Sequence, residues 1–323
     1  MKKLKLGEGN DINLTDALDL IIPYTQGFFA RVFTGFFHLN GNNKRYAVKI
    51  MRPERMDSID NFIRETRVLK MLDDVEGITR MLYMGMIKLD EKYEFPSHEQ
   101  SARGLEGNVD LFLPKEIDTF SSQLPEMIEQ GWLPFITLEL RSEPNLYTLC
   151  DRYFTAGKYL DLNTGIKITI QICDILEKAH KRGILLTDYK IAHFYWQDLF
   201  DKVYIIDWNC AVIKERPLTE GEIGYDLAQF GARTLYHLFT GSEPSGAPSI
   251  QTTDIQEVLT APSKYRSDWD HDTKERLSAS LMDFLSKLMD GQYSSVNQLK
   301  QDLSSEVKKK LILLIRNHQQ FEN

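Results

Sequence analysis

Two aspartates, Asp188 and Asp207, have the residue type and the setting for phosphoryl-transfer chemistry. Asp207 ends an apolar run, and Asp188 is followed two residues later by Lys190. In transfer from a nucleoside triphosphate, one carboxylate orients the attacking hydroxyl and accepts its proton, and another holds the metal ion that bridges the phosphates. The alternative is that both are ordinary turn residues, since Asp before an aromatic residue is common where a strand ends. The choice depends on what precedes them in the chain.

A site of this kind also needs a cation for the phosphates, and Lys49 is the candidate. Residues 26–35 and 45–51 have the pattern of two strands joined by an Asn-Gly turn, and Lys49 lies among apolar neighbours in the second strand. Residues 58–72 place apolar residues at helical spacing and carry Glu65, which could hold the lysine in place. The alternative for Glu65 is a solvated carboxylate on a helix surface.

With these pieces in order, the chain resembles the protein-kinase superfamily, in the form of the bacterial Ser/Thr protein kinases. The resemblance covers roughly residues 20 to 305, and the ordered set of motifs is more specific than any one of them. In chain order the motifs are Ala47-Val48-Lys49, Glu65, the strand and hinge at 135–141, the helix at 175–184, the loop at 186–193, Asp207-Trp208-Asn209, the helix at 225–241 and the closing helix at 292–299.

The resemblance implies an α+β fold with two lobes. Residues 1–140 would form an N-terminal lobe with a small antiparallel sheet and one main helix, interrupted by an insertion at about 88–131. Residues 141–305 would form a mostly α-helical C-terminal lobe, and residues 306–323 an amphipathic helix packed on it. The insertion is rich in Glu, Ser, Gly and Pro, so it is either a mobile segment or a docking arm for a protein substrate or partner.

The resemblance also implies ATP and Mg as cofactors, with Mn possible, and transfer of the γ-phosphoryl group to a Ser/Thr hydroxyl of a protein. Asp188 would act as the base and Lys190 would neutralise the developing charge, while Asp207 and His193 would be the metal ligands. Leu138 would be the gatekeeper residue beside adenine. The implied nucleotide-binding residues are Gly27, Val32, Ala47, Lys49, Glu65, Leu138, Glu139 and Arg141.

Several residues depart from the kinase pattern. Gly27 is the one loop glycine at its expected place, and Leu186-Thr187 replaces the His-Arg before the catalytic Asp. Without that Arg, a phosphorylated activation loop would have no basic partner, so we expect no switching by loop phosphorylation. His193 stands where the family has a metal-binding Asn. Imidazole prefers Zn or Mn to Mg, and the alternative is that His193 is a hydrogen-bonded packing residue.

The segment after Asp207 is short. Asp226 follows Asp207 by nineteen positions, and no Ala-Pro-Glu motif lies between them. Together with Gly224–Ala228, this feature also resembles the aminoglycoside and choline phosphotransferases, which share the fold and act on small molecules. Lys190 and the helix end at 235–241 favour the protein kinases instead. A third reading is a pseudokinase scaffold that binds nucleotide or a partner without turnover.

Composition predicts an intracellular enzyme. The 323 residues, 42% hydrophobic, are enough for two separate cores. The net charge of −8 argues against a nucleic-acid or anionic-membrane surface. Cys150, Cys173 and Cys210 lack the spacing of a disulfide framework or a zinc site. Neither a membrane-spanning apolar run nor a signal-peptide core is apparent, so we expect a cytoplasmic protein with no membrane span.

Overall fold

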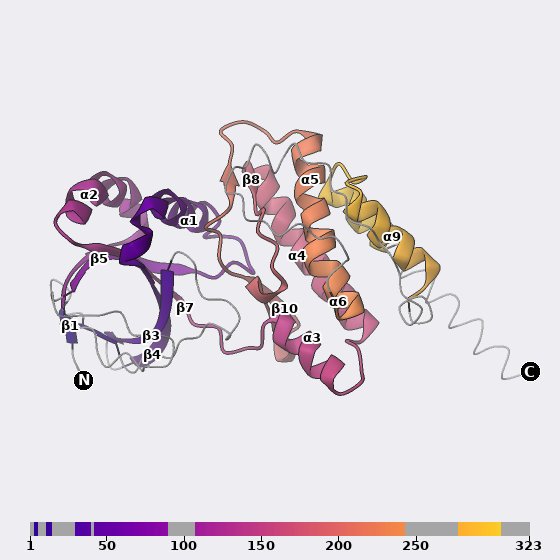
Figure 1. The fold of residues 1–323 in the computed structure, drawn as a ribbon, viewed down its shortest axis with the longest axis horizontal. Coiled ribbons are helices and arrows are strands. Elements are labelled where there is room, and N and C mark those ends of the chain that lie inside the picture. Colours follow the sequence, from indigo (N-terminus) through magenta and orange to yellow (C-terminus); the bar gives the residue numbers. More distant parts are fainter. Residues whose placement is uncertain are drawn as a thin grey trace, which may run out of the picture. The chain divides into compact units, whose positions relative to one another are not determined.

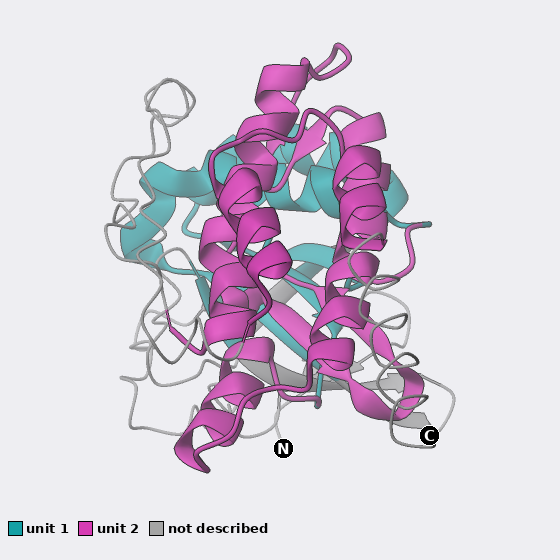
Figure 2. Cartoon of the chain, turned by 90° about the vertical axis from the view of Figure 1, so that its right-hand side faces the viewer, with its two compact units in different colours: residues 1–74, 78–142, 207–210 teal, residues 75–77, 143–206, 211–323 magenta. Residues whose placement is uncertain are grey.

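The computed structural model describes residues 3–5, 11–14, 30–39, 42–89, 107–242 and 277–304. These residues have a mixed α+β fold (Figure 1), and the chain divides into two compact units (Figure 2). Unit 1 comprises residues 1–74, 78–142 and 207–210, and unit 2 comprises residues 75–77, 143–206 and 211–323. Gly27, residues 90–106 of the expected insertion, and the helix expected at 306–323 lie outside the described residues.

Unit 1 is built on a seven-stranded sheet in which every neighbouring pair is antiparallel. Its longest pairing is the hairpin that carries Lys49, in register from Ala30 opposite Met51 to Leu39 opposite Asn42. In spatial order the strands are β1 (Lys3–Lys5), β2 (Asp11–Leu14), β3 (Ala30–Leu39), β4 (Asn42–Met51), β7 (Leu133–Glu139), β5 (Met81–Leu89) and β6 (Gly107–Phe112).

Two helices of unit 1, α1 (Ile59–Met71) and α2 (Ile117–Glu129), lie beside this sheet (Figure 1). Helix α1 follows a 3₁₀ turn, η1 (Pro53–Ser58), and buries the stripe Phe62, Val68 and Leu69. Residues three to four apart share one face of a helix, so the same face that packs these apolar side chains also carries Glu65 inward. Burial of each large apolar side chain contributes about 1.5–3 kcal/mol. The position of Glu65 is therefore fixed by the core.

The segment at 107–131 belongs to the folded unit. Its residues form strand β6, the short 3₁₀ turn η2 (Pro114–Glu116) and helix α2. Phe120 and Leu124, one helical turn apart, are buried, and the Phe120 ring packs edge-on against Phe112 at 5.4 Å. The expectation of a mobile insertion is wrong for this part, because two apolar anchors at helical spacing outweigh the polar composition. The expectation of one main helix is likewise corrected, since unit 1 has two.

Unit 2 is mainly α-helical. Among the described residues, no helix is both long and apolar enough to cross a membrane. The helices are α3 (Leu146–Thr155), α4 (Leu162–Lys181), α5 (Glu220–Phe230), the π-helical turn η5 (Gly231–Leu235), α6 (Tyr236–Thr240), α9 (Ala279–Met289) and a helix over 296–304.

Two short antiparallel pairs in unit 2 hold the loop that contains Asp188. Strand β8 (Ile184–Leu185) precedes the loop and pairs with β11 (Val212–Ile213). The 3₁₀ turn η3 (Ile191–His193) follows the loop and leads into β9 (Phe194–Gln197), which pairs with β10 (Lys202–Ile205) around the turn η4 (Asp198–Phe200). The loop is thus anchored at both ends.

Gly183, at the entry to β8, gives a test of how tightly this region packs. Its φ is 73°, and an added Cβ would lie 2.4 Å from the carbonyl oxygen of Lys214. Gly157 has a similar φ of 66° but open space around it. We expect Gly157→Ala to lower the free energy of unfolding by about 1 kcal/mol, the cost of left-handed backbone alone. Gly183→Ala adds a backbone clash and should cost at least about 3 kcal/mol. Urea titration of both variants measures these losses in the free energy of unfolding. Equal losses in the two variants would contradict the packing described.

Candidate functional site

Lys49 is the centre of a buried ionic cluster in unit 1. Its Nζ lies 2.9 and 2.7 Å from the two carboxylate oxygens of Glu65 and 2.6 Å from Oδ1 of Asp207. Lys49 is 8% exposed and Glu65 is 1% exposed. The cluster therefore joins strand β4, helix α1 and the segment 207–210. The interpretation of Glu65 as a solvated surface carboxylate is wrong.

The protonation behaviour of the cluster follows from burial and from its two carboxylates. Burial raises the pKa of Glu65, and the charge of Lys49 opposes this shift. Burial lowers the pKa of Lys49, but Asp207 and Glu65 outweigh it, so the pKa of Lys49 is raised above its ordinary value. The backbone N–H of Trp208 also donates to Glu65. Lys49 thus remains an ammonium group, held by two carboxylates.

Side chains expected to line a nucleotide site share one face of the sheet around Lys49. Ala47 precedes Lys49 by two positions, Val32 lies opposite Lys49 on β3, and Leu138 lies opposite Ala47 on β7. Residues directly opposite in an antiparallel pair, and residues two apart in one strand, point to the same side. Register alone therefore places Val32, Ala47, Lys49 and Leu138 on a common face.

The strand end next to Leu138 holds the remaining expected nucleotide contacts. Glu139 ends β7 opposite Tyr46, and its side chain pairs with that of Arg141. The side chains are thus engaged with each other, while the expected adenine contacts involve the backbone.

Left-handed backbone occurs at Asp207 and at the residue directly before Asp188. Asp207 has a φ of 62°, and Thr187, directly before Asp188, has a φ of 61°. Left-handed backbone costs roughly 1–2 kcal/mol for a residue with a Cβ and is a clear outlier for a β-branched one. Strain of this kind persists where surrounding contacts over-determine it, and it concentrates at functional sites.

Asp188, Lys190 and His193 form a second cluster, within unit 2. Lys190 Nζ donates to Asp188 Oδ2 at 2.8 Å. His193 Nδ1 lies 3.2 Å from the backbone oxygen of Asp188 and 4.0 Å from its Oδ2. A carbonyl oxygen only accepts, so Nδ1 carries the proton in this contact. These contacts give His193 a role in holding the Asp188 loop, as expected for a hydrogen-bonded packing residue. Its role as a metal ligand stays a prediction.

Asp226 on α5 holds the same loop from inside unit 2. It is fully buried, and its Oδ1 accepts the backbone N–H of Thr187 at 2.9 Å. Its Oδ2 accepts the hydroxyl of Tyr189 at 2.6 Å and lies 2.8 Å from Nε2 of His180. These contacts fix the residues on both sides of Asp188, including the strained Thr187. In the sequence, Asp226 is recognisable only as part of a helix motif. The available signal was an acid next to the apolar residues Leu227 and Ala228 in the part of α5 that is buried.

The chain matches no model of a known protein family, and no curated protein is significantly similar to it.

The Asp226 network predicts the effect of removing one of its donors. Burial and Asp226 raise the pKa of Tyr189, so its hydroxyl stays protonated and donates to the carboxylate. Tyr189→Phe should lower the free energy of unfolding by about 1.5–3 kcal/mol, as expected for a hydrogen bond to a charged group. Tyr204→Phe is the matched control, because its hydroxyl lies 3.5 Å from Gln197 and should cost at most about 0.5 kcal/mol.

Chemical denaturation measures both losses, and hydrogen exchange at the Thr187 amide measures the effect on the loop. Exchange at this amide should accelerate in Tyr189→Phe and not in Tyr204→Phe. Equal behaviour of the two variants would contradict a supporting role for Asp226.

Proposed function

We propose that this chain is an ATP-dependent phosphotransferase with a two-lobed protein-kinase-like fold, which transfers the γ-phosphoryl group to a Ser/Thr hydroxyl of a protein in the cytoplasm. The observation that carries the proposal is the buried Lys49, held by Glu65 and Asp207 on a sheet face shared with Val32, Ala47 and Leu138. A buried ammonium group fixed by carboxylates beside an apolar strip is suited to a nucleotide, because it meets phosphate while the strip meets the base.

Nucleotide binding would use unit 1. Lys49 would hold the α- and β-phosphates, and Glu65 would keep the ammonium group in place, as their 2.7 Å contact supports. Adenine would lie against Val32, Ala47 and Leu138 and bond to the backbone of Glu139 and Arg141. Preorganised charge of this kind needs little rearrangement during the reaction.

The residues around Asp207 fit a magnesium ion. Two carboxylates share one lysine in this cluster, so a further cation would balance the charge. Mg²⁺ is commonly held by one or two carboxylates together with substrate phosphates and water. No group of three or more acidic, His or Cys side chains in the described part of the chain could hold a metal unaided. Asp207 would therefore bind it jointly with ATP, where it would neutralise phosphate charge.

Proton transfer would use the loop in unit 2. A carboxylate oxygen of Asp188 would accept the proton of the acceptor hydroxyl as this attacks the γ-phosphorus. The bond from the γ-phosphorus to the oxygen bridging to the β-phosphorus would break, ADP would leave with that oxygen, and Lys190 would neutralise charge on the transferred group. The 2.8 Å contact between Lys190 and Asp188 supports a shared role. The Asp226 contacts support a rigid placement of the base.

Transfer to a small molecule is the second candidate, favoured by the segment that follows Asp207. After β11, residues 214–219 lead directly into α5, which starts at a capping box formed by Thr219 and Glu222. Arg216 forms a bidentate pair with the same Glu222 at 2.9 and 2.8 Å. Little chain is left here to bind an extended peptide.

Single substitutions test the assigned roles. Asp188→Ala should lower turnover by about 10²–10⁴-fold, as expected for loss of a general base, and leave ATP affinity nearly unchanged. Asp207→Ala should weaken the binding of Mg-ATP as well, because it removes the metal ligand. Transfer from radiolabelled ATP and calorimetric ATP binding are the measurements. Asp151→Ala, at an exposed position of α3, is the control and should behave as wild type. Unchanged turnover in Asp188→Ala would overturn the assignment.

The acceptor is tested separately with wild-type protein, Mg²⁺ or Mn²⁺, and either a generic protein substrate or a panel of small hydroxylated metabolites. We expect label on the protein substrate or on the chain itself. Label only on metabolites would establish the second candidate instead. Thermal stabilisation by ATP without transfer to any acceptor would identify a pseudokinase.

A further inference from the structure

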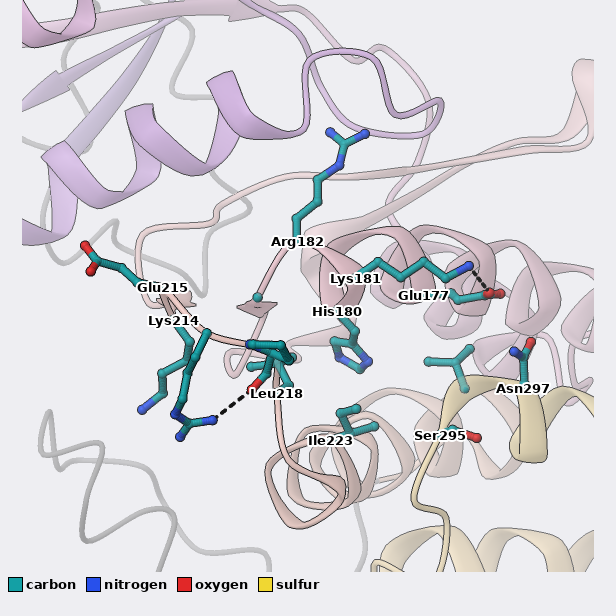
Figure 3. Close-up of a pocket in the computed structure, with 14 residues that line it drawn as sticks. Glu177, His180, Lys181, Arg182, Lys214, Glu215, Leu218, Ile223, Ser295 and Asn297 are labelled. Atoms are coloured by element: carbon teal, nitrogen blue, oxygen red, sulfur yellow. Dashed lines mark hydrogen bonds and ion pairs between the residues drawn. The ribbon is translucent and has the colours of Figure 1, made fainter.

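A cavity of about 530 Å³ lies within unit 2 and is not lined by Asp188, Lys190 or His193 (Figure 3). The end of α4, the segment 214–218, Ile223 of α5 and residues 295–297 line it, and it is open to solvent. Its volume is within the range of about 300–1,000 Å³ that small-molecule sites occupy. The cavity is therefore large enough for a ligand of two fused rings.

Part of the cavity wall is apolar. Pro217, Leu218, Ile223 and Val296 contribute to it. Burying apolar ligand surface against such a wall contributes about 25 cal/mol for each Å² removed from water. The wall thus suits a flat apolar body.

On the α4 side of the cavity, the ammonium group of Lys181 lies beside the Glu177 carboxylate, which also binds a second cation. Lys181 and Glu177 both line the cavity, and their contact is 2.6 Å long. Glu177 also binds Lys300 at 2.8 Å. Lys300 also binds Asp174 at 2.8 Å, so when Lys181 interacts with a ligand, Glu177 still keeps one cation at hydrogen-bond distance.

The opposite side repeats this arrangement. Lys214 and Arg216 line the cavity and share Glu222, which Arg216 binds in bidentate fashion while Lys214 lies 3.5 Å away. The Arg216 hydrogen bond pins Glu222 and lowers its pKa to about 2. The charged residues that line the cavity are four cations, Lys181, Arg182, Lys214 and Arg216, and two carboxylates, Glu177 and Glu215, so the lining is more positive than a chain whose net charge is −8 would suggest. Such walls favour an anionic ligand group.

His180 supplies a third, polar feature. The residue is 8% exposed, and its side chain lines the cavity (Figure 3). Nε2 donates a hydrogen bond to the Asp226 carboxylate at 2.8 Å, and in the neutral tautomer that makes this bond Nδ1 presents a lone pair. Among the described residues, Nδ1 has no hydrogen-bond partner. A buried acceptor without a partner is unfavourable, so a ligand donor at this position would be stabilising.

We propose that this cavity binds a small hydroxylated aromatic acid, and that its occupancy stabilises the backbone loop that carries Asp188. The ring lies on the apolar wall, the acid group interacts with Lys181 or Lys214, and the hydroxyl donates to His180 Nδ1. His180 connects the ligand to the loop, because its other nitrogen bonds to Asp226, which holds Thr187 and Tyr189. The binding site does not depend on the proposed phosphotransfer function.

The first test uses the full chain and 6-hydroxy-2-naphthoic acid, a fluorescent probe that has all three features. We expect saturable binding, with 2-naphthoic acid, which lacks the donor, and 2-naphthol, which lacks the charge, each at least about fivefold weaker. Absence of saturable binding, or equal affinity of the three compounds, would overturn the proposal.

A charge-removing pair of substitutions locates the probe. In Lys181→Gln with Lys214→Gln, each carboxylate keeps its other cation, Lys300 or Arg216, so folding is retained. The dissociation constant should rise at least about fivefold. The matched control is Lys167→Gln with Lys287→Gln, two lysines of unit 2 whose side chains are 55% and 43% exposed, do not line the cavity and pair with other carboxylates. Equal affinity in the two double variants would contradict the site.

Hydrogen exchange tests the link to the loop. The Thr187 amide donates to Asp226, so exchange at this amide should slow several-fold in wild type saturated with the probe. The control double variant should show the same protection. Saturable binding with no change in Thr187 exchange would overturn the coupling through His180.

Discussion

A buried lysine that bridges two carboxylates is the interaction on which unit 1 depends. Lys49 and Glu65 are almost completely removed from water. A buried ion pair that loses one partner leaves an uncompensated charge, at a cost of roughly 3–5 kcal/mol. Strand β4, helix α1 and the segment 207–210 must therefore be placed together. The apolar stripe of α1 and the β3–β4 hairpin provide the packing that makes this placement stable.

In unit 2 the buried charge is negative, and it also holds separate segments of the chain together. Its buried charge is the carboxylate of Asp226, and the groups that satisfy it are donors from the loop and from α4. The loop before Asp188 contains a β-branched residue in the left-handed region, which favours relaxation of the backbone. The Asp226 hydrogen bond to the strained residue opposes this relaxation. The buried Asp226 carboxylate thus holds the strained backbone next to Asp188, the proposed base, in one conformation.

The sequence predicted the features whose signals are local. A single lysine in an apolar strand and a glutamate on the apolar face of a helix are visible over a few residues, and the structure brings both together. The role of Asp226 was missed because its partners Thr187, Tyr189 and His180 lie about forty residues away in the chain. The segment 107–131 was expected to be mobile because its overall composition is polar. The spacing of Phe120 and Leu124, which places both on one buried helix face, is a better guide than that composition.

The assignment of residues 207–210 to unit 1 has a consequence for the independence of the two units. The backbone leaves unit 1 for residues 75–77, leaves it again after 142, returns at 207 and departs after 210. A polypeptide cut after residue 142 would lack Asp207, and its lysine would lose one of two counter-ions. The other fragment would retain four residues whose partners are missing. The two units are therefore interleaved along the chain, so no single cut of the polypeptide separates them into two complete units.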